Sequence, residues 1–185
     1  MIKKSFFIIL VVSSQVLFSW CAVYFTPRDD LKSLLIELIK EERKSIDCAM
    51  YMFTEKNIAQ EILQAYLRGV KVRILLDPVS MDTKYGKGLF LKNNGMHICV
   101  FEPAFSNAYL EPIMHHKFFI FGYNQRLQRS LIWTGSYNCT SSASRLHEEN
   151  VILTDDVGAI EEYKKCFSAM LARFDKVRYL QDDNE

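Results

Sequence analysis

The sequence lacks the features that would assign it quickly to several large classes of protein. Its five cysteines have none of the close paired spacings that are typical of zinc sites and thioredoxin-type redox sites. Neither sign of charge is in excess, because 23 lysine and arginine residues face 22 aspartate and glutamate residues, so composition alone does not require a nucleic-acid partner. Internal repeats, linkers and low-complexity segments are also absent. The 185 residues are therefore expected to form one ordinary globular domain.

The first 22 residues differ from the rest of the chain. Lys3 and Lys4 precede a run at residues 6–20 that is apolar except for a few serines and one glutamine. This pattern predicts a signal peptide over residues 1–22, and hence a secreted or periplasmic protein. A retained N-terminal membrane anchor is the alternative, because the run is only slightly short for a membrane span. Without the two lysines of this segment, the remaining chain has 21 basic and 22 acidic residues.

Hydrophobic periodicity predicts alternating helices and strands within residues 23–178, followed by an acidic tail at 179–185. Helices are indicated by apolar residues at intervals of three and four, and strands by short apolar or alternating runs. The predicted elements are a helix at 29–42, a strand at 45–53, a helix at 55–68, a strand at 70–76, a helix at 86–94, a strand at 97–101, a strand at 149–154 and a helix at 157–174. The strand–helix–strand order favours right-handed crossovers. We therefore expect an α/β fold with a mixed, mainly parallel β-sheet flanked by helices on both faces.

The most informative stretch is residues 114–138, which has the pattern of a hairpin of two apolar strands. His115 and Lys117 lie two apart on the first strand, and Ser136 and Asn138 lie two apart at the end of the second. Residues i and i+2 of a strand point to the same face of a sheet. A nucleophile, a fixed cation and two neutral hydrogen-bonding groups are thus expected to converge on one tetrahedral anion without a metal. We expect apolar packing around them from four residues of the hairpin, Phe118, Ile120, Leu131 and Trp133.

Three motifs in this part of the chain resemble those of the phospholipase D superfamily. They are His115-His116-Lys117, Gly135-Ser136-Tyr137-Asn138 and Glu149-Asn150-Val151, and the helix-to-strand turn at 68–77 is also similar. The resemblance covers residues 25–174. It is strongest to the small single-motif members, which are bacterial secreted endonucleases and phospholipases and a mitochondrial-surface relative. It implies a phospholipase D-like fold and a single phosphodiesterase domain over residues 23–178.

The resemblance also implies a metal-independent phosphodiester hydrolase that needs no cofactor. His115 would be the nucleophile, attacking phosphorus to form a phosphohistidine. Lys117 would bind the phosphate oxygens as a point charge. Ser136 and Asn138 would hydrogen-bond those oxygens where charge builds up in the transition state. Glu149 would hold the nucleophilic imidazole in its reactive tautomer.

The family's reaction needs a second histidine, which protonates the leaving oxygen and then activates water. This chain has only one His-x-Lys motif, at His115 and Lys117. The second imidazole is therefore expected from another copy of the chain. The resemblance thus implies a C2 homodimer with the active site on its two-fold axis.

The sequence departs from the family pattern at one position of the motif. The family has His-x-Lys, four residues and then aspartate, whereas this chain has Gly122 at that place. Residues 123–129 resemble an inserted hairpin loop, and no acid lies between Gly122 and Ser136. In the family this aspartate is a structural brace rather than a reacting group. Its loss affects the expected stability and efficiency more than the mechanism, and it motivates a catalytically weakened phosphate-binding module as one alternative.

The sequence leaves two substrate classes open. We favour an endonuclease acting on nucleic acid, because small single-motif relatives are often nucleases. The alternative is a phospholipase D that cleaves phospholipid head groups, since the aromatic-rich residues 101–109 and the apolar N-terminus suit a membrane. The near-neutral charge of the mature chain weakens the first hypothesis, because affinity for nucleic acid rests on neutralising phosphates.

The remaining histidines are more simply interpreted as structural. His116 should point away from His115 across the strand and is expected to be packed. His147 is expected outside the site, although its position two residues before Glu149 leaves a role there open. A zinc set of three histidines is disfavoured by the neighbouring lysine and by the absence of a suitably spaced carboxylate. Residues 50–53 are interpreted as core.

Overall fold

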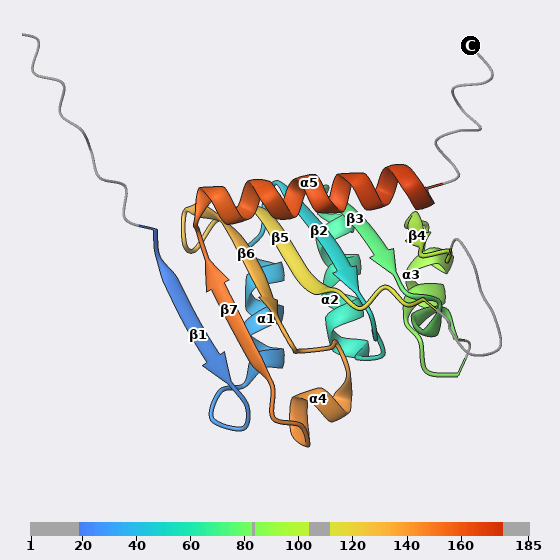
Figure 1. The fold of residues 1–185 in the computed structure, drawn as a ribbon, viewed down its shortest axis with the longest axis horizontal. Coiled ribbons are helices and arrows are strands. Elements are labelled where there is room, and N and C mark those ends of the chain that lie inside the picture. The colour runs from blue at the N-terminus through green and yellow to red at the C-terminus, as the bar shows by residue number, and fades with distance from the viewer. Residues whose placement is uncertain (1–18, 83, 104–111, 176–185) are drawn as a thin grey trace, which may run out of the picture.

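A twisted β-sheet forms the middle layer of the fold (Figure 1). The computed structural model describes residues 19–82, 84–103 and 112–175. Within these ranges seven strands form one sheet in the order β1-β7-β6-β5-β2-β3-β4. The strands are β1 (Cys21–Phe25), β2 (Ser45–Met50), β3 (Lys71–Leu76), β4 (Ile98–Val100), β5 (Lys117–Asn124), β6 (Arg129–Gly135) and β7 (Asn150–Thr154).

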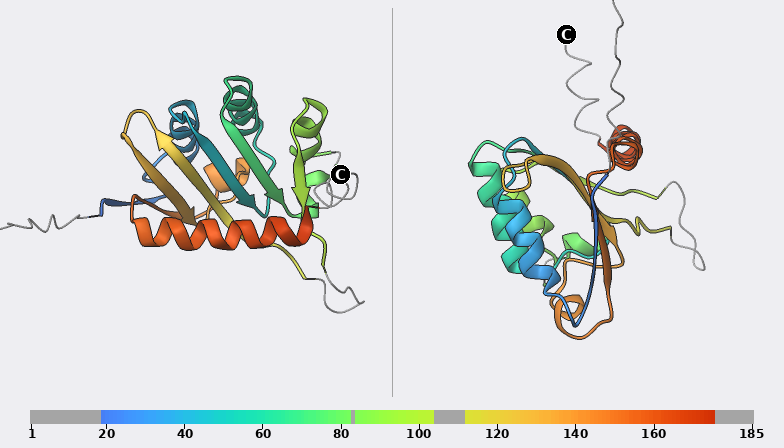
Figure 2. Two further views of the ribbon diagram at one scale, coloured as in Figure 1. Left: turned by 90° about the horizontal axis from the view of Figure 1, so that it is seen from above. Right: turned by 90° about the vertical axis from the view of Figure 1, so that its left-hand side faces the viewer.

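Helices cover both faces of the sheet (Figure 2). The long helix α5 lies along one face, and α1, α2 and α3 lie on the other. The helical elements are α1 (Leu31–Lys40), α2 (Lys56–Leu67), the 3₁₀ turn η1 (Pro78–Met81), α3 (Gly88–Asn93), α4 (Ser141–Arg145) and α5 (Val157–Phe174). The predicted α/β class, and the prediction of helices on both faces, are confirmed.

The sheet is mixed, as predicted, but its parallel part is the smaller one. Strands β2, β3 and β4 are parallel neighbours, joined by the helical crossovers that the sequence predicts. The pairs β2–β5, β5–β6, β6–β7 and β1–β7 are antiparallel. The expectation of a mainly parallel sheet was therefore wrong, because the β5–β6 hairpin reverses the chain and β7 and β1 extend the sheet from it.

The apolar residues of the β5–β6 hairpin divide between the two faces of the sheet. Phe118 and Ile120 pack beneath α5, whereas Phe119 lies opposite Trp133 in the larger core on the other face. Lys117 shares its face with Phe119, because successive strand residues alternate. The expected packing of Phe118 and Ile120 around Lys117 was therefore wrong, while that by the residues of β6 was right.

Local sequence signals explain where several helices begin and end. The Asp30 carboxylate accepts a hydrogen bond from Ser33 N at 3.0 Å and caps α1. Gly69 follows α2 with φ of +89°, and Gly95 follows α3 with φ of +85°. Glycine adopts this left-handed conformation without steric cost, so both residues end their helices.

β1 lies where the sequence analysis placed the end of a leader segment. Cys21 and Ala22 pair with residues of β7, so cleavage after residue 22 would remove the first two residues of this strand. Most of the leader, at 1–18, and the acidic tail at 179–185 lie outside the described residues, and both stay predictions. Among the residues that the structure describes, none of the helices has the length and apolarity that crossing a bilayer requires.

Candidate active site

His115 and Lys117 lie together where the chain enters β5. The Lys117 side chain is 8% exposed, and its Nζ donates a hydrogen bond to the carbonyl oxygen of the exposed His115 at 2.7 Å. Tyr51, which follows β2, contacts both residues. Its ring centroid lies 4.6 Å from that of His115 and 5.3 Å from Lys117 Nζ. The imidazole and the ammonium group therefore share one face, next to an aromatic ring that the sequence analysis had assigned to the core.

Two hydrogen bonds hold the backbone on either side of His115. Met114 N donates to Asp77 Oδ2 at 2.9 Å, and Tyr51 N donates to His116 O at 2.9 Å. Asp77 ends β3 and is 4% exposed. A carboxylate that accepts a backbone N–H makes a stronger bond than a neutral acceptor does. The exposed imidazole is thus carried on a backbone segment that is fixed at both ends.

Gly135 permits the close approach of β6 and β7 that positions Ser136. A Cβ atom on Gly135 would lie 2.1 Å from Asn150 O, so no other residue fits there without moving the strand. Ser136 N donates to that same carbonyl oxygen at 3.0 Å, and Asn150 N donates to Ser136 Oγ at 3.0 Å. The glycine of the motif is therefore required for packing, and it places the serine against the start of β7.

Glu149 lies at the centre of a small hydrogen-bonded cluster. Ser136 Oγ donates a hydrogen bond to Glu149 Oε2, and Thr26 Oγ1 accepts one from Glu149 N at 2.7 Å. His147 Nδ1 lies 3.7 Å from Glu149 Oε1. The Glu149 side chain is 8% exposed. The single hydroxyl proton of Ser136 is used by Glu149, so Ser136 can donate to a phosphate oxygen only when that bond is released.

Asn138 is held by the segment that follows β2. Its Oδ1 accepts a hydrogen bond from Met52 N at 3.2 Å, and the carbonyl oxygen of Cys139 accepts bonds from Thr54 N and Glu55 N, both at 2.8 Å. With its oxygen bonded in this way, the Asn138 side chain presents its NH₂ group as a donor. The amide is therefore anchored next to the Tyr51 backbone, whose ring contacts the imidazole of the predicted nucleophile.

Burial lowers the pKa values of two basic residues, Lys117 and His116. Desolvation lowers the pKa of Lys117, and the negative charge of Glu149 partly offsets this effect. Desolvation also lowers the pKa of His116, and the charges of Lys117 and His115 act in the same direction. The Glu149 carboxylate therefore acts on the Lys117 ammonium group through its charge, without an ion pair between them in the part of the chain that the structure describes. Tyr51 contacts His115 and Lys117, and Glu149 bonds Ser136 and acts on Lys117 through its charge. Four of the predicted site residues are connected in this way.

The expected contact between the Glu149 carboxylate and the His115 imidazole is not present within one chain, in the residues that the structure describes. In the part of the chain that the structure describes, the His115 ring contacts Tyr51, and no hydrogen bond joins it to Glu149. The nearer imidazole is that of His147, which the sequence analysis had placed outside the site. The sequence analysis also missed Tyr51 and Asp77 as neighbours of the site. Their position at the ends of adjacent strands, β2 and β3, was the signal that was available for finding them.

Gly122, which stands at the place of the missing aspartate, lies close to Ser45. A Cβ on Gly122 would lie 2.3 Å from Ser45 Oγ. The fully buried Glu42 uses its Oε1 atom to accept backbone hydrogen bonds from Lys44, Ser45 and Tyr123 at 2.7, 3.0 and 2.8 Å. A carboxylate therefore does lie beside this position, supplied by the turn before β2. The strand also continues to Asn124, so the predicted loop at 123–129 is shorter than expected.

An apolar hollow adjoins the two adjacent histidines. It has a volume of about 310 Å³, and four of the residues that line it beside His115 and His116 are Phe101, Ile113, Met170 and Phe174. His116 faces Phe118, with ring centroids 5.6 Å apart, and so points to the α5 side as predicted. Within the described residues, no three histidine, cysteine, aspartate or glutamate side chains gather in an arrangement suited to a metal ion.

Comparison with known proteins agrees with this architecture. The family model "Cardiolipin synthase, PLD-like domain" matches residues 35–171. The chain is 25% identical over 159 residues to a mitochondrial cardiolipin hydrolase of Xenopus tropicalis, covering 86% of this chain and 70% of that protein. It is 30% identical over 139 residues to a phospholipase D of Rickettsia prowazekii, covering 75% of this chain and 62% of that protein. The chain thus spans about two thirds of the length of these relatives.

Solved structures share the fold. NucT from Helicobacter pylori superposes with a TM-score of 0.72 at 24% identity, covering 84% of this chain and 97% of that one. Nuc from Salmonella typhimurium, described as a phospholipase D family member, has a TM-score of 0.70 at 21% identity and covers 85% and 97%. With the family model matching most of the chain, and the motifs gathered where the strands end, this chain belongs to the phospholipase D superfamily of phosphodiesterases.

Proposed function

We propose that this protein is a metal-independent phosphodiester hydrolase that works through a phosphohistidine on His115, and that its substrate is nucleic acid. The observation that carries the proposal is the convergence at one end of the sheet of an exposed imidazole, a buried ammonium group and a buried carboxylate. Lys117 bonds the backbone of His115 and is influenced by the charge of Glu149. Such a site can bind a phosphate and hold a nucleophile beside it.

The reaction follows from these groups in two displacements. An imidazole nitrogen of His115 attacks phosphorus, and the bond from phosphorus to the leaving oxygen breaks as a second imidazole donates a proton to that oxygen. The second imidazole then takes a proton from water, the resulting hydroxide attacks phosphorus, and the P–N bond breaks. Lys117, with the donors of Ser136 and Asn138, would stabilise the charge on the phosphate oxygens in both steps.

The second imidazole belongs, in this proposal, to His115 of another copy. A C2 homodimer would place both imidazoles at the two-fold axis, where one phosphate lies between them. Activity per chain should then fall on dilution as dimers dissociate. Sedimentation equilibrium together with activity at matched concentrations checks this. A monomer that stays fully active would overturn the dimer proposal and would direct attention to His147, which lies beside Glu149.

Turnover of a small phosphodiester tests the chemistry without assuming a natural substrate. Bis(4-nitrophenyl) phosphate should be hydrolysed in the presence of a chelator, and His115→Ala should not exceed the background rate. Acid-labile, base-stable phosphorylation of the wild-type chain, seen by intact-mass analysis, would identify the covalent intermediate. Equal rates for both proteins would favour the phosphate-binding module instead. The Glu42 carboxylate beside Gly122 supports the active enzyme, because a brace is present despite the missing aspartate.

Phospholipid is the second candidate substrate, and the apolar hollow beside His115 favours it. A hollow of about 310 Å³ lined by Phe101, Ile113 and Phe174 suits an acyl chain or a glycerol backbone better than a nucleotide. The names of the relatives in Xenopus and Rickettsia agree with this candidate. Cleavage of cardiolipin or phosphatidylcholine vesicles and of single-stranded DNA, compared in chelator, separates the two. Only cleavage of nucleic acid should fall steeply with salt.

The location of the protein follows from the N-terminal segment in this proposal. Residues 1–22 would act as a signal peptide, which exports the domain to the periplasm or medium, or as an anchor that keeps it on a membrane. N-terminal sequencing of the protein recovered from each fraction distinguishes these outcomes. A mature chain that begins at residue 23 is expected from a cleaved signal peptide, and this chain would lack Cys21 and Ala22, the first two residues of β1, which pair with β7. Recovery of the uncleaved chain from membranes would favour the anchor instead.

A further inference from the structure

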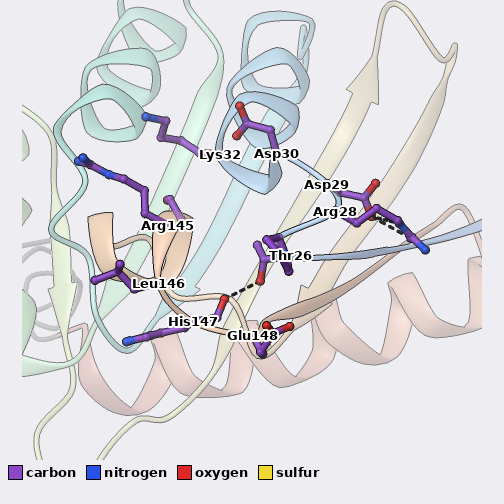
Figure 3. Close-up of a pocket in the computed structure, with 11 residues that line it drawn as sticks. Thr26, Arg28, Asp29, Asp30, Lys32, Arg145, Leu146, His147 and Glu148 are labelled. Atoms are coloured by element: carbon purple, nitrogen blue, oxygen red, sulfur yellow. Dashed lines mark hydrogen bonds and ion pairs between the residues drawn. The ribbon is translucent and has the colours of Figure 1, made fainter.

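A polar hollow of about 470 Å³ lies between the turn that follows β1 and the segment that joins α4 to β7 (Figure 3). Thr26 comes from the first of these segments and Lys32 from the start of α1, while Arg145 ends α4 and His147 and Glu148 follow it. We refer to it as the Lys32–Arg145 hollow.

The hollow shares a wall with the predicted active site. His147 lines the hollow, and its Nδ1 atom lies 3.7 Å from Glu149 Oε1. Thr26 Oγ1 donates to His147 O at 2.7 Å and accepts from Glu149 N at 2.7 Å, so one hydroxyl fixes both residues. The hollow and the predicted active site therefore meet at Glu149. A polymer that binds with one phosphate at Lys117 has the hollow as one of the directions in which it can extend.

Several charged side chains of the hollow already interact with other residues of the protein and are not free to bind a ligand. Arg28 Nη2 lies 2.8 Å from Asp29 Oδ2, so these two charges neutralise each other. The Asp30 carboxylate is used by Ser33, whose backbone N and hydroxyl donate to it at 3.0 and 2.7 Å. The acid that is left is Glu148, which has no cation within ion-pair distance among the described residues.

Two cations of the hollow stay unpaired. In the described ranges, no acidic side chain lies within ion-pair distance of Lys32 or Arg145. Figure 3 shows the ends of Lys32, Arg145 and His147 toward one side of the view, while Asp29 and Arg28 lie toward the other. Both side chains line the hollow and neither is committed to an ion pair within the described residues, so each is available to contact a phosphate there.

We propose that the Lys32–Arg145 hollow binds a phosphate that neighbours the scissile one in a nucleic-acid strand. The proposal rests on the proposed function, because it needs the reacting phosphate at His115 and Lys117. A nucleic acid carries a phosphate on every nucleotide, so a strand bound at the predicted active site also presents phosphates on either side of the reacting one. The lining offers little for acyl chains, since Pro27 and the largely exposed Leu146 are the apolar residues that the structure describes there.

Removal of each cation tests the proposal on two substrates. Lys32→Ala and Arg145→Ala should each raise KM for a single-stranded oligonucleotide and leave kcat/KM for bis(4-nitrophenyl) phosphate unchanged. Each lost contact should also reduce, by about threefold, the fall in oligonucleotide kcat/KM between about 50 and about 200 mM salt. Lys92→Ala is the matched control, because it removes one exposed charge from α3, away from the hollow. Lys32→Arg should retain affinity.

The outcomes separate this proposal from the proposed function. If the wild type hydrolyses the small ester no faster than His115→Ala, the proposed function fails. If the ester is hydrolysed by all variants, but Lys32→Ala and Arg145→Ala weaken oligonucleotide cleavage no more than Lys92→Ala does, the hollow is not a phosphate site. Loss confined to cardiolipin vesicles would overturn the nucleic-acid assignment. Thermal unfolding of each variant shows whether any loss reflects misfolding.

Discussion

The two ends of β5 are built in opposite ways. At the Lys117 end, polar side chains are only partly engaged: His115 is exposed and its ring contacts Tyr51. At the other end, Glu42 and Asn124 are fully buried, and each is used to hold backbone groups. One end of the strand keeps its polar groups available for a ligand, whereas the other end uses them to fix the strand.

This difference explains how the chain can do without the family's aspartate at position 122. Asn124 Nδ2 donates to Leu38 O at 3.1 Å, and Tyr123 N donates to the Glu42 carboxylate at 2.8 Å. Gly122 lies so close to Ser45 that a larger side chain would clash. The bracing at this end therefore comes from α1 and the turn after it.

The largest effect is expected at the Lys117 end. His115→Ala should lower turnover of a phosphodiester by on the order of 10³-fold or more, because the nucleophile is lost. The melting temperature should stay the same, since the side chain is exposed. His116→Ala is the control, because His116 points to the other face of the strand. Equal losses in the two variants would contradict the assignment of His115.

At the opposite end, Glu42→Ala should affect stability rather than chemistry. Three partly buried backbone N–H groups lose their acceptor, which should lower the free energy of unfolding by about 2 kcal/mol. Urea unfolding measures this change, and kcat per folded molecule should be nearly unchanged. The adjacent Glu41→Ala serves as control, because Glu41 makes a partly exposed ion pair with Arg43 at 3.5 Å. If both variants lose the same small amount, Glu42 is not a brace.

Asp77, which follows β3, bonds the backbone next to His115, the proposed nucleophile. Asp77→Ala should lower kcat by about tenfold with little change in KM, because Met114 N loses its acceptor and His115 is less well placed. Asp77→Asn keeps an oxygen acceptor and should restore most of the rate. A purely structural role predicts a fall in melting temperature for both variants and no such recovery of kcat.

The smallest expected effect is a change in the pH dependence of kcat/KM that arises from the ionisation of Lys117. Burial lowers its pKa from the ordinary 10.5. Lysine is charged below its pKa, so this ammonium group should lose its proton at a lower pH than an exposed lysine does. The alkaline limb of the pH profile of kcat/KM should therefore fall below 10.5, and Lys117→Arg should move it upward, since arginine stays charged. An alkaline limb that is the same in both proteins would assign it to another group.

The helices and the hairpin could be predicted from the sequence because their signals are local. The apolar spacing within residues 157–174 indicated α5, whose buried side chains include Ile160 and Phe167. Asp30 and Gly69 marked the ends of α1 and α2 for reasons that involve only neighbouring residues. The same-face placement of His115 and Lys117 likewise follows from the period of a strand.

The sequence by itself thus determined the family, the residue types of the site and most of the helices and strands, but not β1 or α4. Only the tertiary structure decided that β5 pairs with β2, that Tyr51 and Asp77 flank His115, and that His147 lies beside Glu149. It also revealed that Glu42 supplies a carboxylate next to Gly122. The physical reason is that periodicity and capping act over a few residues, whereas these contacts join segments far apart in the chain through strand order and register.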